Sequence, residues 1–184
     1  MVNKVYLWDS KIKKFQDTIP VDIRGMAESL NVKVVEIDFQ MISSDRRVMD
    51  KVICALFKFN RMKNSEDVSI TLYLDSNLTI PNINYIIACV VSFRLLYSDY
   101  TKVNTFFLTS ENDNDDIEMN VGMEKETEVV TTVIDYALQL IIPEKLFKEA
   151  LDLNREERKT IESLAKSFNV PDRAMRSRIM KLLK

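Results

Sequence analysis

The chain has 184 residues, of which 46% are hydrophobic and 29% are charged, and its formal net charge is −2. This composition predicts one globular domain with a sizeable core, with room for a small appendage. There is no histidine, and glycine occurs only at Gly25 and Gly122. These counts exclude histidine-based zinc hydrolases, Ser-His-Asp triads, Cys-His dyads, Walker loops and glycine-rich dinucleotide-binding loops.

We expect a cytoplasmic protein that makes no membrane contact. No secretory leader opens the chain, and the longest apolar run, residues 83–96, falls short of the roughly 18 residues of a membrane span. Cys54 and Cys89 both lie in apolar surroundings, where a free cysteine behaves as a small hydrophobic residue. We therefore favour two buried thiols over the alternative, a disulfide.

The first half of the chain predicts a helix and several strands. Residues 4–9 indicate a short strand, and Pro20 precedes a helix at 21–30 with one apolar face, formed by Ile23, Met26, Ala27 and Leu30. Runs of β-branched and aromatic residues then predict three strands, of which the second and third form a hairpin: residues 33–39, 52–59 and 68–75. Residues 83–100, "INYIIACVVSFRLLYSDY", predict a buried apolar helix.

The second half is mainly helical. Residues 103–109 predict either a strand or an extended crossing segment, and a helix with apolar residues at Val129, Val133 and Tyr136 ends at Pro143. Three shorter helical stretches follow: residues 144–151, 155–168 and 171–184. The expected fold class is α+β, with a small, mainly antiparallel three-stranded sheet packed with helices and then a helical C-terminus.

Charge is distributed unevenly along the chain. Residues 111–128 include eight acidic residues and one basic residue, Lys125, which gives a local charge of −7. Residues 155–184 include nine basic and four acidic residues, which gives a local charge of +5. The acidic stretch has no EF-hand spacing and reads as a solvated loop. Its alternative reading is an acidic decoy for a basic nucleic-acid site of a host enzyme.

Four segments in this order resemble the ImmA/IrrE-type metallopeptidase family. They are a hairpin ending in "ITLYLDSNL", the apolar helix, a later helix ending in "LIIPEKLF", and the C-terminal "LAKSFNVPDRAMRSRI". The resemblance covers roughly residues 20 to 184. It implies a minimal zincin-like domain at residues 1–142 and a helix-turn-helix-like module at 143–184 packed on it.

The resemblance also assigns the positions of the family's zinc chemistry. The family's helix reads approximately IAHELGHYLL and falls on "IACVVSFRLL", so the two histidines correspond to Cys89 and Phe93 and the catalytic glutamate to Val90. The third ligand falls on Thr132, with Glu128 one turn earlier. Val90 cannot accept a proton and Phe93 cannot bind a metal. We therefore expect no metal, no cofactor and no catalysis, and we treat Cys89 as a structural thiol rather than a nucleophile.

The C-terminal segment is the other candidate for function. It has the outline of a helix-turn-helix, with Asn169 where a left-handed turn usually requires glycine. We expect Met175, Ile179 and Leu182 to pack inward. Outward-facing basic residues would then contact a protein partner or nucleic acid: Lys166, Arg173, Arg176, Arg178, Lys181 and Lys184.

The function expected from the resemblance is that of a pseudoprotease. The family is typical of phages and other mobile elements, where it relieves helix-turn-helix repressors, so a copy without zinc would act by binding as an antirepressor. The first alternative is a DNA-binding regulator that uses the basic C-terminal helix, as a homodimer presenting two such helices, although base readout would favour more Gln, Asn or Ser beside the arginines. The second is an inhibitor of a host enzyme or defence protein.

Overall fold

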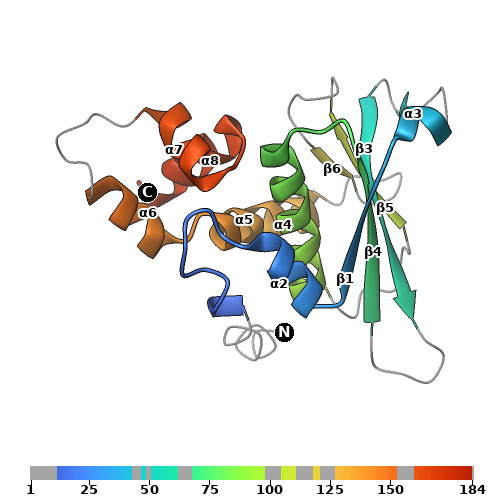
Figure 1. Ribbon diagram of the computed structural model, residues 1–184, viewed down its shortest axis with the longest axis horizontal. Coiled ribbons are helices and arrows are strands. Elements are labelled where there is room, and N and C mark those ends of the chain that lie inside the picture. The colour runs from blue at the N-terminus through green and yellow to red at the C-terminus, as the bar shows by residue number, and fades with distance from the viewer. Residues whose placement is uncertain are drawn as a thin grey trace.

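The computed structural model describes residues 12–42, 47–48, 51–61, 68–97, 105–110, 118–120, 127–152 and 160–183 (Figure 1). Its helices are α2 (Ile23–Ser29), α3 (Phe39–Ile42), α4 (Ile80–Leu96), α5 (Thr127–Ile141), α6 (Glu144–Asp152), α7 (Ile161–Phe168) and α8 (Asp172–Leu182). Its strands are β1 (Val32–Ile37), β2 (Arg47–Val48), β3 (Lys51–Arg61), β4 (Val68–Asp75), β5 (Thr105–Ser110) and β6 (Glu118–Asn120). The strand predicted at residues 4–9 lies outside the described residues.

The described strands form one mixed sheet of six strands. Their order is β1-β4-β3-β5-β6, with β2 also paired to β3, and β1 runs parallel to β4 while the other pairs are antiparallel. The α+β class is confirmed, but the expectation of three strands is wrong. The long, apolar strand β3 pairs along both of its edges, with β4 on one side and β5 on the other. Residues 105–110 are therefore a strand and not a crossing segment.

Alternation along the strands gives the sheet a buried face. β3 and β4 pair antiparallel, as the sequence predicts, and this register places Phe57 beside Leu72 and Phe59 beside Ile70. All four of these side chains are buried in the core. The helix predicted at 21–30 is also confirmed as α2, which begins after Asp22, whose carboxylate accepts a hydrogen bond from the Gly25 N–H at 2.9 Å. Its four expected apolar residues are buried.

Helix α4 is the centre of the core. It lies between the sheet and α5 (Figure 1), and its buried residues surround the helix instead of forming one stripe. It begins at Ile80, earlier than predicted, because Pro81 occupies the first turn, where a missing N–H costs no hydrogen bond. Within the described ranges, no helix combines the length and apolar character needed to cross a membrane.

The C-terminal helices pack on the end of this core. α5 ends just before Pro143, as predicted, and α7 is followed by Asn169 in the left-handed conformation, with φ of 53°. The Val170 N–H donates to the Ala165 carbonyl at 3.0 Å, which closes the end of α7. The Asn84 side chain donates to the Asn169 carbonyl at 3.1 Å, so α4 is joined directly to the α7–α8 turn.

Candidate functional site

Three of the four positions to which the resemblance assigns zinc chemistry lie inside the core. Cys89, Val90 and Phe93 all belong to α4, and their exposed fractions are 1%, 0% and 0%. A catalytic cleft needs its ligands and its base in contact with water and substrate. At these three positions the space is filled by protein.

Phe93 faces the sheet. Its ring centroid lies 5.6 Å from that of Phe57 and 5.6 Å from that of Phe59, both on β3, and 5.3 Å from that of Tyr97 at the end of α4. Edge-to-face and tilted ring pairs at these distances stabilise a core beyond the area they bury. Phe93, to which the resemblance assigns the second histidine, is thus the centre of an aromatic cluster, defined by Phe57, Phe59, Phe93 and Tyr97.

Cys89 is a buried free thiol, as is Cys54, which confirms the expected pair of thiols. Burial raises the pKa of the Cys89 thiol to about 12, an effect that a hydrogen bond with the Tyr85 side chain partly offsets. The thiolate, which is the nucleophile and the metal ligand, is therefore scarce at neutral pH. This geometry supports a structural role for Cys89.

Thr132 does not share this buried environment. It is exposed on α5, and its hydroxyl donates to the carbonyl of Glu128 at 2.8 Å. Glu128 is also exposed. Across the described ranges no group of three or more His, Cys, Asp or Glu residues is placed to hold a metal ion. The donor set does not fit zinc, because one ligand position is a protonated buried thiol, one is a phenylalanine and one is a surface threonine.

The structure corrects the prediction for Arg178. This residue was expected on the outer face of the last helix, but it is only 8% exposed, and its Nε–H donates to the Ile142 carbonyl at 3.0 Å. The reason lies at the end of α5, where terminal carbonyls have no partner within the helix. Burial lowers the pKa of Arg178, and Glu144 partly offsets this shift. Arg178 is therefore a structural residue and not part of an outer contact surface.

The other basic residues of this region differ in exposure and in the ion pairs that they form. Arg176 forms an ion pair with Glu162 at 3.5 Å, and Lys181 forms one with Asp135 of α5. Lys166 and Arg173 are exposed on α7 and α8, while Lys184 lies outside the described residues. Met175 is buried, and Ile179 and Leu182 pack partly buried against the core, which confirms the inward face of α8.

No family model, no curated protein and no solved structure matches the chain.

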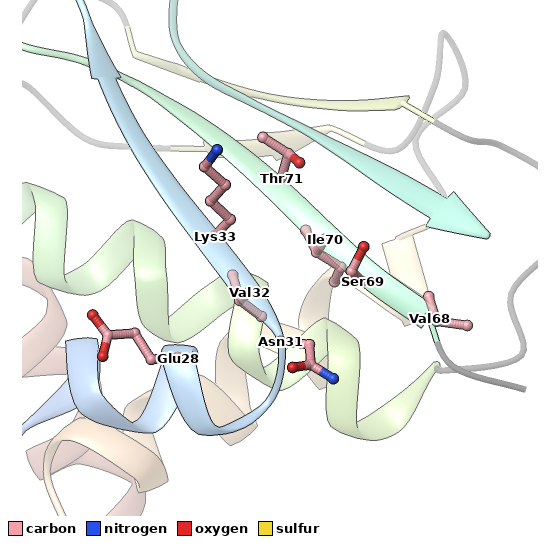
Figure 2. A pocket seen from close by; sticks show the side chains of 8 residues that line it. All are labelled: Glu28, Asn31, Val32, Lys33, Val68, Ser69, Ile70 and Thr71. Atoms are coloured by element: carbon pink, nitrogen blue, oxygen red, sulfur yellow. The ribbon is translucent and has the colours of Figure 1, made fainter. Parts of the chain in front are cut away.

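A different feature, which the sequence reading missed, lies at the N-terminal ends of β1 and β4. A hollow of about 590 Å³ lies here. Figure 2 draws the side chains of the eight residues that line it: Glu28, Asn31, Val32, Lys33, Val68, Ser69, Ile70 and Thr71. The signal available in the sequence was the alternation of small polar residues with apolar ones in "VSITLYLD". This alternation places Ser69 and Thr71 together on one face of β4, opposite the core.

Proposed function

We propose that this chain is a pseudoprotease, a catalytically inactive protein on a scaffold resembling the ImmA/IrrE-type metallopeptidases, and that it acts by binding a protein partner. The single observation that carries the proposal is the burial of Cys89, Val90 and Phe93, the positions that correspond to two zinc ligands and the base. Resemblance of the four sequence segments supports the scaffold, and the burial supports the loss of cleavage.

Physical chemistry explains why these replacements favour a stable fold. An imidazole or a carboxylate buried without a partner costs several kcal/mol, whereas an apolar side chain of suitable shape gains about 1.5–3 kcal/mol on burial. Phe93 makes this gain through contacts with β3. Once cleavage is lost, substitution at these positions improves packing, while the outer surface remains free to bind.

The partner that this proposal favours is a helix-turn-helix repressor. A protein that binds the DNA-free form of a repressor lowers operator occupancy by mass action. When the chain is present at a hundred times its dissociation constant, binding supplies about 2.7 kcal/mol. This lowers the concentration of repressor that is free to bind DNA about a hundredfold. The antirepressor role and an origin on a phage or other mobile element rest on the resemblance.

The alternative of DNA binding through α8 loses some of its support. Arg178 is buried, and Arg176 and Lys181 are engaged in ion pairs, so fewer cations are available for phosphates than the sequence predicts. The second alternative, a host-enzyme inhibitor, depends on an acidic stretch that lies mostly outside the described residues. Both alternatives are outcomes that the following experiment separates.

The test begins with the full-length chain used as an affinity bait in extracts of its native cell. The recovered repressor is then bound to labelled operator DNA, and fluorescence anisotropy follows its release as the chain is added. We expect release of the DNA while the repressor stays intact on a denaturing gel, with or without a chelator. Recovery of nucleic acid alone would favour the DNA-binding alternative, and recovery of an enzyme would favour inhibition.

Two results would contradict the pseudoprotease proposal. One is stoichiometric zinc in the purified chain by elemental analysis. The other is cleavage of the partner that a chelator stops. Each of these readouts is independent of whether the partner is a repressor.

A further inference from the structure

We draw no further inference here: the strongest candidate, the hollow at the N-terminal ends of β1 and β4 together with the sheet face beside it, is lined by side chains of both charges, Glu28 and Lys33, and nothing in the structure shows what occupies the hollow or covers the face.

Discussion

At the scale of single residues, the positions that matter most are the buried ones at the centre of α4. Phe93 occupies a ligand position of the resembled family and contacts Phe57 and Phe59 on the central strand. Cys89, one turn earlier on α4, is equally buried. The resemblance of sequence segments could assign these positions, but it could not show whether they lie in an open cleft or in a filled core. That required the side chains of β3, which lie far from α4 in the sequence.

Phe93→Ala should destabilise the protein strongly. The substitution removes a fully buried ring from the aromatic cluster and leaves a cavity, which typically costs about 3–5 kcal/mol. The free energy of unfolding from urea denaturation measures this effect. Met180→Ala serves as the control, because Met180 is 64% exposed and its truncation should change stability by less than about 0.5 kcal/mol. A small effect at Phe93 would mean that the core is loosely packed here.

Cys89 should be unreactive in the folded protein and should make stability pH-dependent at high pH. Its pKa is raised from an ordinary value of 9.0 to about 12, so between these values the unfolded chain has released the proton while the folded chain has kept it. Folding stability contributed by this thiol is therefore present below pH 9 and is lost as the pH rises toward 12.

Two measurements check the behaviour of Cys89. A thiol reagent at pH 8 should label neither cysteine of the native protein and both after unfolding, since Cys54 is buried as well. Cys89→Ala should flatten the fall of the unfolding free energy between pH 9 and 11 relative to the unsubstituted chain. Rapid labelling of native Cys89 would contradict its burial.

At the scale of secondary-structure elements, the sequence was informative wherever a signal was local. The apolar face of α2, the stop of α5 at Pro143 and the left-handed turn at Asn169 were all predicted, because each depends on a few neighbouring residues. The three-residue strand β6 has no such local signal. It forms by antiparallel pairing with the edge of β5. Arg178 was misplaced for a similar reason. Its partner is a carbonyl at the end of a different helix.

Arg178→Ala should destabilise the protein more than Arg173→Ala. The first substitution leaves the buried Ile142 carbonyl without its donor and removes a packed aliphatic stem, which together cost about 1–3 kcal/mol. Arg173 is exposed on the first turn of the same helix, so its replacement should have little effect on unfolding. Urea denaturation of the two variants side by side makes the comparison. Equal stabilities would show that the Arg178 hydrogen bond contributes nothing.

At the scale of the whole molecule, the general α+β class could be predicted, but the sheet topology could not. Runs of β-branched residues identify strands without saying which of them pair, and the parallel pairing of β1 with β4 joins segments on either side of the β2 and β3 region. The candidate site shows the same division. The resemblance of four sequence segments assigned its positions, whereas their burial against β3 depends on contacts between segments that lie far apart in the sequence.

Introducing the zinc motif of the resembled family should not create a zinc site. In Cys89→His, Val90→Glu, Phe93→His the new polar groups would enter a filled core, and Thr132 lies exposed on α5. Burying such groups without partners costs several kcal/mol, which is comparable to the roughly 5–15 kcal/mol total stability of a domain. We expect extensive unfolding by circular dichroism and substoichiometric zinc by elemental analysis. A folded variant with one equivalent of zinc would mean that this region of the core opens readily.

The parallel pairing of β1 with β4 at one edge of the sheet also affects how the protein folds during its synthesis. Val32 pairs with Ile70, so β1 leaves the ribosome well before the strand that will hold it, and the intervening hairpin strand β3 must be made first. Contacts between distant segments close loops slowly, so we expect β1 and α2 to dock late. During that interval we expect Val34 and Ile37 to be unprotected, and the charges of the neighbouring Lys33 and Glu36 to discourage the nascent edge from pairing with another chain.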